Sequence, residues 1–295
     1  MNDNNPDGGL SIDSFELEDK LSKIRSQINS KLDNQKHLAI ILSAVEENIE
    51  EQKNDKTPVA YFVSFLSLLD QCISNDQILD SNLAATTAYF LDLVFPFTPK
   101  PLLKSKFNQI LAKLAQPLTL ENAEAALVRS TIGALESLLL AQDGSSWNSK
   151  GQVSPKRAFL ALLETSFDPR PKVRKRAQEA VSKILSNPPA SPSPTHVAAP
   201  LAADAALTQL STLLNTYKTQ KKNKEVNSQI IHVLQLIKMI TSTNSWPVNK
   251  IEELCDILLE ISKTSDQFLV SSAFGAFEGL FQSMTDVIDV EKFTR

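Results

Sequence analysis

Glycine is scarce in this chain, with only seven residues among 295. Tight β-hairpins and phosphate-binding loops depend on glycine, so the sequence predicts few structures of either kind. The motifs GxxxxGK[ST], GxGxxG and GxSxG do not occur, which removes the usual signals for a nucleotide site or a nucleophile elbow. A helical chain, in contrast, needs little glycine.

Cysteine and histidine are scarce as well. Cys72 and Cys255 lie far apart within apolar helical patterns, and no CxxC or HExxH spacing accompanies His37, His196 or His232. A zinc site or a disulfide framework needs clustered ligands or regularly spaced cysteines. We therefore expect buried free thiols, no cofactor and no metal, and we predict that the chain is not an enzyme.

Long apolar runs are also missing. No stretch of about 18 consecutive apolar residues, the length that a membrane-spanning helix needs, can be found. The sequence predicts no membrane partner. No motif points to a small-molecule substrate.

Apolar residues instead recur at helical spacing along most of the chain. Helices are repeatedly opened by a small polar residue followed by proline, as at Thr57-Pro58 and Ser154-Pro155. About six helix pairs follow one another at a spacing near the 40 to 47 residues of HEAT or armadillo arrays. The pattern predicts an all-α, HEAT/armadillo-like α-solenoid of about six helix pairs, with a single irregular helical bundle as the alternative.

Composition divides the chain into four parts. Residues 187–200 hold five of the fifteen prolines, which is too many for a regular helix. The apolar pattern of Val287, Val290 and Phe293 runs on to the last residues with no polar cap, so we expect the N-terminal part of a longer superhelix. The predicted parts are a disordered N-terminus (1–13), HEAT-like repeats (14–186), a flexible linker (187–202) and continuing repeats (203–295).

One segment, residues 168–185, combines a helix start, an apolar stripe and a dense positive charge. Pro171 suits the first turn of a helix, and Val173, Ala177, Val181 and Leu185 follow at intervals of four residues. Residues 168–186 carry six bases and two acids, whereas residues 1–55 carry six bases and twelve acids. The candidate RNA- or partner-binding residues are Arg170, Lys172, Arg174, Lys175 and Arg176, with a second group at Lys218, Lys221, Lys222 and Lys224.

The basic cluster has three possible interpretations. It can be a solvated helix face, in which Arg174 bonds an acid of a neighbouring repeat. It can contact RNA phosphates, which would make binding sensitive to salt. It can also be a nuclear-import signal, although such signals are usually bound in an extended conformation. Aromatic residues do not interleave with the bases, so contact with a nucleic-acid backbone is favoured over base stacking.

Three stretches together resemble one known family. They are residues 17–49, which contain Leu17-Glu18-Asp19-Lys20-Leu21 and Val45-Glu46-Glu47-Asn48-Ile49, then residues 58–71, and then residues 168–185. In these the chain resembles the N-terminal region of the ribosomal RNA-processing protein 12 family, fungal branch. The resemblance covers nearly the whole chain and carries no catalytic residues.

The resemblance implies a large α-solenoid of the nucleus and nucleolus, able to shuttle to the cytoplasm. Its implied partners are pre-ribosomal particles, pre-rRNA and ribosome-assembly proteins, and also Ran and nucleoporins. The leading hypothesis is a non-enzymatic scaffold in rRNA processing, small-subunit maturation and export of ribosomal subunits. The alternatives are a karyopherin-like transport receptor or adaptor without direct RNA contact, and a structural platform that binds proteins only.

Overall fold

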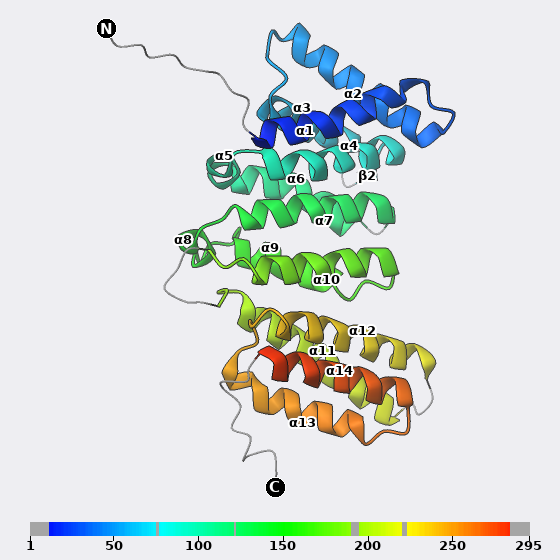
Figure 1. The fold of residues 1–295 in the computed structure, drawn as a ribbon, viewed down its shortest axis with the longest axis vertical. Helices are drawn as coiled ribbons and strands as arrows, with labels where there is room; N and C mark the ends of the chain where they lie inside the picture. Colours follow the sequence, from blue (N-terminus) through cyan, green and yellow to red (C-terminus); the bar gives the residue numbers. More distant parts are fainter. Residues whose placement is uncertain (1–11, 75–76, 121, 190–194, 220–222, 284–295) are drawn as a thin grey trace. The chain divides into compact units, whose positions relative to one another are not determined.

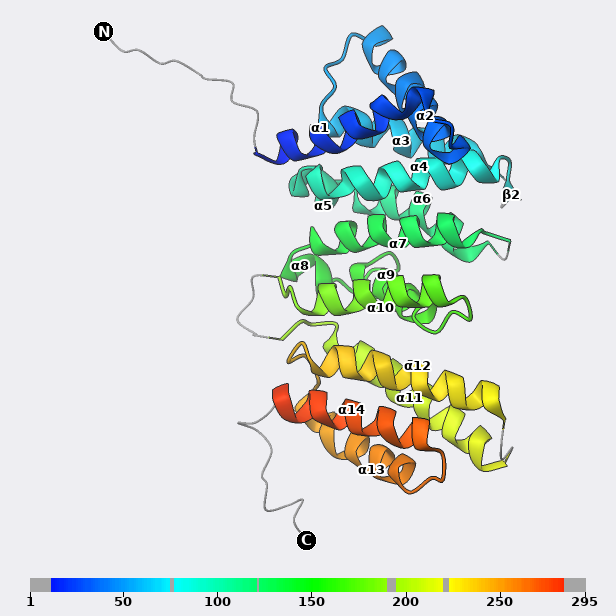
Figure 2. The ribbon, with the colours of Figure 1, turned by 45° about the vertical axis from the view of Figure 1, so that its right-hand side comes forward.

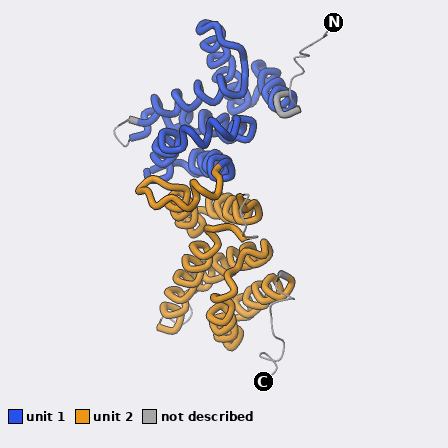
Figure 3. Tube along the Cα trace, turned by 90° about the vertical axis from the view of Figure 1, so that its left-hand side faces the viewer, with its two compact units in different colours: residues 1–141 blue, residues 142–295 orange. Residues whose placement is uncertain are grey.

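The computed structural model describes residues 12–74, 77–120, 122–189, 195–219 and 223–283. The chain divides into two compact units, residues 1–141 and 142–295, which Figure 3 shows in two colours. Helices dominate both units. Strands in the described residues are limited to a two-residue antiparallel pair, β1 (Ile73–Ser74) and β2 (Gln77–Ile78). The predicted all-α class is therefore confirmed.

Unit 1 contains three consecutive helix pairs, α1/α2, α3/α4 and α6/α7 (Figure 1). The short elements η1, η2 and α5 lie between them. Their bounds are α1 (Ile12–Arg25), η1 (Ser26–Asn29), α2 (Asp33–Glu51), α3 (Pro58–Cys72), α4 (Ser81–Val94), η2 (Phe95–Phe97), α5 (Lys100–Ser105), α6 (Phe107–Thr119) and α7 (Ala125–Leu140).

The helix starts follow the local chemistry that the sequence predicts. The Thr57 hydroxyl accepts a hydrogen bond from the Ala60 N–H at 3.2 Å, with Pro58 as the first helical residue. A carboxylate oxygen of Asp80 accepts one from the Leu83 N–H at 2.9 Å. Each cap satisfies one backbone donor that the first turn leaves unpaired. The predicted start of α3 is confirmed, and α4 begins by the same chemistry at Asp80.

The core of unit 1 lies where α4 packs against α3 and α7. The Phe65 and Phe90 rings stack with centroids 4.6 Å apart, and both residues are fully buried. Gly133 of α7 lies against the carboxylate of Asp92 on α4, where a Cβ atom would overlap the carboxylate. A larger residue at position 133 would therefore displace the Asp92 carboxylate.

One residue of α2 departs from the prediction. The acidic residues 46, 47, 50 and 51 are expected to face solvent, but Glu46 is buried. Its carboxylate accepts hydrogen bonds from the Arg25 Nε and the Tyr61 hydroxyl, both at 2.8 Å. Arg25 also bonds Glu18, so this network ties α1, α2 and α3 together. Burial is tolerated because the charge is paired.

Unit 2 also contains three helix pairs, α9/α10, α11/α12 and α13/α14 (Figure 2). The second helices of these pairs, α10, α12 and α14, are neighbours, with α12 in the middle. The bounds are α8 (Gly144–Trp147), α9 (Pro155–Thr165), α10 (Pro171–Leu185), α11 (Ala199–Thr219), α12 (Lys224–Thr241), η3 (Val248–Lys250), α13 (Ile251–Ser262) and α14 (Gln267–Ser283).

The segment expected to be a flexible linker is packed at its C-terminal end. His196 and Ala198 are buried, and α11 begins at Ala199, earlier than predicted. The His196 ring lies edge-on to Trp147, with centroids 4.5 Å apart. Trp147 belongs to α8, a short helix within the predicted polar loop 143–151. Apolar contact with the buried tryptophan overrides the local loop composition.

Residues 1–11 of the predicted disordered N-terminus lie outside the described residues, as do Val287, Val290 and Phe293. The division of the chain at a linker over residues 187–202 stays a prediction.

Candidate interaction surface on the basic helix

Helix α10 places the basic cluster at one edge of unit 2. Pro171 is its first residue, as predicted, and its fixed φ and missing N–H suit that position. The apolar stripe of α10, including Val173, Ala177 and Val181, is fully buried. Because side chains three or four residues apart share one helix face, the basic residues are distributed around the rest of the helix.

Arg170 serves the turn that precedes α10. Its guanidinium bonds both carboxylate oxygens of Asp168, at 2.9 and 2.8 Å, and its backbone N–H donates to one of them at 2.8 Å. Burial favours the protonated form of Asp168, but the hydrogen bonds and charge of Arg170 outweigh it and lower the pKa of that carboxyl. Arg170 therefore acts mainly as a partner of Asp168.

Arg174 also contacts other residues of unit 2 through its guanidinium group. One guanidinium nitrogen donates to the carbonyl oxygens of Asp168 at 2.8 Å and Pro169 at 3.2 Å, and the other contacts His232 Nε2 at 3.0 Å. The prediction of an acidic partner in a neighbouring repeat is wrong, because the long side chain reaches backbone carbonyls and an imidazole first.

His232 of α12 was not predicted to take part in this cluster. A guanidinium can only donate, so His232 Nε2 must accept and the ring must be neutral. Burial and the charge of Arg174 lower the pKa of His232 in agreement with this. Gln178 reinforces the contact by donating to the carbonyl oxygens of Ser166 and His232. Arg174 and His232 are 58 positions apart in sequence, so no local pattern could have revealed that they form a pair.

Lys172, Lys175 and Arg176 are the remaining members of the basic cluster. Lys172 and Lys175 are exposed, and Arg176 is half-buried. Lys175 lies 3.8 Å from Glu179, an exposed pair of the kind that contributes little to stability and leaves a cation accessible. The two lysines are therefore the cluster members best placed to meet a negatively charged partner.

The second basic group is only partly described. Lys218 pairs with Glu260 at 2.6 Å, linking α11 to α13, and Lys224 is exposed in the first turn of α12. Lys221 and Lys222 lie outside the described residues. The first turns of α10 and α12, with which the described parts of the two basic groups are associated, lie at the same edge of unit 2 (Figures 1 and 2).

A hollow of about 720 Å³ lies on the surface that α10, α12 and α14 form together. Hydroxyl groups of α10, of α14 and of the turn that follows α12 line it, including Ser182, Ser271 and Ser242, and Lys238 of α12 contributes a cation. Lys238 lies 4.0 Å from Glu278, which is a weak exposed pair. Neutral hydroxyls and one lysine thus line this hollow.

Other kinds of site find no support in the part of the chain that the structure describes. It contains no group of three or more histidine, cysteine or acidic side chains that could hold a metal ion. It also contains no helix that is long and apolar enough to cross a membrane. Cys72 and Cys255 are buried free thiols, as predicted, and burial raises the pKa of Cys255 to about 11.

Comparison with known proteins gives one consistent result. The family described as RRP12-like, N-terminal HEAT repeats, matches residues 19–285. The chain is 50% identical over 287 residues to ribosomal RNA-processing protein 12 of Saccharomyces cerevisiae, covering 92% of this chain and 23% of the relative. It is 24% identical over 264 residues to the human RRP12-like protein, covering 89% of this chain and 19% of the relative. The chain thus spans less than a quarter of the length of these relatives.

Proposed function

Because the chain belongs to the family of RRP12-like proteins, whose N-terminal HEAT repeats it matches, we propose that it is a non-enzymatic scaffold in ribosome biogenesis. It would bind pre-ribosomal particles through pre-rRNA and through ribosomal or assembly proteins. In doing so it would support rRNA processing, small-subunit maturation and nuclear export of subunits. The name of the yeast relative supports the processing role, and the stacked helix pairs supply surface for binding.

The exposed lysines of α10 carry the RNA part of this proposal. Lys172 and Lys175 are exposed on α10, whereas Arg170 and Arg174 of the same cluster are held by partners within unit 2. Each phosphate that a lysine neutralises releases counterions and strengthens binding at low salt. Lys224 is an exposed base in the first turn of α12 and adds positive charge to unit 2. We infer that the edge of unit 2 where α10 begins contacts the RNA backbone.

The helical state of α10 argues against the import-signal interpretation. Residues 171–176 belong to a regular helix, and Val173 among them is fully buried. A receptor that binds extended peptide would have to unfold this turn and remove Val173 from the core. A location in the nucleus and nucleolus is proposed from the family alone.

Salt-dependent RNA binding tests the contact. In the double variant Lys172→Gln/Lys175→Gln, two lost phosphate contacts should reduce the slope of log K against log salt by up to about 1.4 for single-stranded RNA. Helicity should not change, because both side chains are exposed. The charge-matched control is Lys31→Gln/Lys36→Gln, which removes two exposed lysines from unit 1. Equal slopes of log K against log salt in the two double variants would contradict the RNA contact and would support the interpretation of the basic cluster as a solvated helix face.

The transport-receptor alternative, with Ran and nucleoporins as partners and no RNA contact, predicts a different pattern. Immobilised nucleoporin repeats should then retain the chain, and the Lys172→Gln/Lys175→Gln variant should be retained equally well. Crosslinking of RNA to the tagged full-length protein in cells separates the two hypotheses. Enrichment of pre-rRNA supports the scaffold, whereas a background level of pre-rRNA together with nucleoporin retention supports the receptor.

A further inference from the structure

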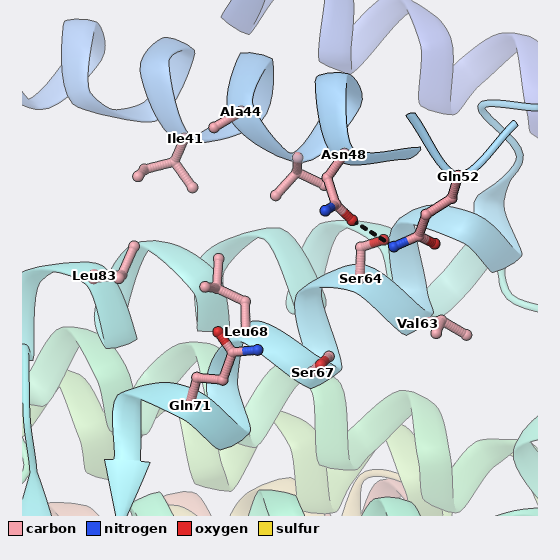
Figure 4. Close-up of a pocket in the computed structure, with 11 residues that line it drawn as sticks. Ile41, Ala44, Asn48, Gln52, Val63, Ser64, Ser67, Leu68, Gln71 and Leu83 are labelled. Atoms are coloured by element: carbon pink, nitrogen blue, oxygen red, sulfur yellow. Dashed lines mark hydrogen bonds between the residues drawn. The ribbon is translucent and has the colours of Figure 1, made fainter. Parts of the chain in front are cut away.

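A groove in unit 1 is unrelated to the basic helix. A hollow of about 390 Å³ lies between α2 and α3, and a second of about 330 Å³ lies between the turn that joins these helices and the first half of α3. They share Gln52, Val63 and Ser64, so they form one continuous depression. In Figure 4, Ile41, Ala44 and Asn48 of α2 line it from one side and α3 lines it from the other. We call it the α2–α3 groove.

The lining of the groove mixes apolar and neutral polar groups. The apolar residues include Ile41 and Leu68, together with Val63, whose side chain is left 55% exposed. The polar residues are amides and hydroxyls, including Asn48, Ser67 and Gln71. Asp55, at one end, is the sole charged residue among those lining the two hollows. Apolar side chains of a partner could therefore be buried in the groove without covering a charged side chain, except near Asp55.

The neutral polar groups favour an extended occupant. A helix satisfies its own backbone hydrogen bonds, whereas an extended segment needs donors and acceptors from its surroundings. The side-chain NH₂ group of Gln52 donates to the side-chain oxygen of Asn48 at 2.9 Å (Figure 4). The side-chain NH₂ group of Asn48 and the side-chain oxygen of Gln52 remain available to hydrogen-bond the backbone of a bound segment. From Ile41 to Gln52, α2 rises about 16 Å, which matches about five residues of extended chain.

The charges beside the groove specify the partner further. Glu47 and Glu51 are exposed on α2, and neither pairs with a base among the described residues. Asp55 is exposed at the groove end, and Lys53 is an exposed base two residues before it in the sequence. Phosphate groups would be repelled here, and the chain's own residues 1–11, with two acids and no base, do not fit either.

We propose that the α2–α3 groove binds an extended segment of another protein that carries apolar side chains beside lysine or arginine. The apolar side chains would fill the groove, the amides and hydroxyls would bond the segment's backbone, and the acids would attract its bases. This binding goes beyond the proposed RNA contact and does not depend on it, because the groove belongs to unit 1 and the basic helix to unit 2.

A synthetic peptide, Lys-Ile-Arg-Val-Lys-Leu-Arg, labelled for fluorescence anisotropy, tests the proposal on the full chain. It should bind, and binding should weaken at least tenfold in the variants Ala44→Trp and Ser67→Trp, which fill the groove from exposed positions. Gln109→Trp, on an exposed position of α6, is the control and should bind normally. Equal affinity in all four proteins would overturn the site.

Two further arms test the chemistry. The double variant Glu47→Gln/Glu51→Gln should lose several-fold affinity and most of its salt dependence. A peptide with glutamate at every basic position, and one with serine at every apolar position, should each bind at least tenfold more weakly, and equal binding of either would refute the assignment.

Concentration-dependent dimerisation that Ser67→Trp abolishes would instead identify a second copy as the occupant. Lys172→Gln/Lys175→Gln should bind the first peptide normally, which separates this test from the RNA test.

Discussion

Two adjacent basic residues of α10, Arg174 and Lys175, have different surroundings. Arg174 lies across the turn before the helix and bonds two carbonyl oxygens and His232, whereas Lys175 points outward. Similar charge therefore serves folding at one position and remains available to a partner at the next. A substitution of the whole cluster would mix these two effects.

Replacement of Arg174 should destabilise unit 2. In Arg174→Leu the carbonyl oxygens of Asp168 and Pro169 and the His232 ring lose their donor, at a cost of about 1–3 kcal/mol. Lys175→Leu is the control and should change the free energy of unfolding by less than about 0.5 kcal/mol. Urea denaturation followed by circular dichroism measures both values. Equal stability of the two variants would contradict the role assigned to Arg174.

His196 should make the stability of the chain depend on pH. Burial lowers the pKa of His196 to about 4 from an ordinary value of 6.5. The unfolded chain then binds the proton more readily, so stability is complete above pH 6.5 and falls as the pH is lowered toward 4, by up to about 3 kcal/mol. Protonation would also remove the Nδ1 acceptor of the Ala198 N–H.

The matched variant is His196→Asn, whose side-chain oxygen can replace Nδ1 as the acceptor but does not titrate. Urea unfolding at pH 7 and pH 5 should show a smaller loss of stability in the variant than in the original chain. Identical losses would show that His196 does not titrate in this range.

Between elements, α14 carries two glycines on the side that faces α12, and α12 approaches closely at one of them. A Cβ atom on Gly279 would lie 2.7 Å from the Thr241 hydroxyl and 3.3 Å from the Lys238 carbonyl oxygen. On Gly275 it would meet only the Lys238 side chain, at an ordinary 3.7 Å. Of the two glycines, Gly279 alone is needed for a close approach, and that approach joins helices of consecutive pairs, α11/α12 and α13/α14.

The two glycines should respond oppositely to substitution. Gly279→Leu should lower the free energy of unfolding by about 1–3 kcal/mol, because the larger side chain forces α14 away from α12. Gly275→Ala should be neutral or stabilising by up to about 1 kcal/mol, since alanine favours helix. Urea denaturation of both variants provides the comparison, and a stable Gly279→Leu variant would contradict close packing at this crossing.

Across the whole molecule, charge is divided between the units. Residues 1–141 carry 12 bases and 19 acids, whereas residues 142–295 carry 18 bases and 15 acids. The net charge of −4 conceals this difference. Unit 2 should therefore attract polyanions and unit 1 should attract cationic partners.

Crosslinking of RNA to the intact chain should reflect this division. Ultraviolet crosslinks, mapped by mass spectrometry of the digested protein, should fall mainly within residues 142–295 and should decrease in Lys172→Gln/Lys175→Gln. A majority of crosslinks on α2 or α3 would contradict the assignment of the two surfaces.

The sequence by itself determined the helices, the order of their pairs and the family. Caps such as Thr57-Pro58 and Asp80, and apolar stripes such as that of α10, depend on residues within about four positions of one another, so the local pattern contains them. The basic cluster was also visible. Only the tertiary structure decided that Arg174 bonds His232, that Glu46 is buried, that His196 packs on Trp147 and that a groove lies between α2 and α3. These features depend on how distant helices pack, and helical periodicity places a side chain on a face without specifying what that face meets.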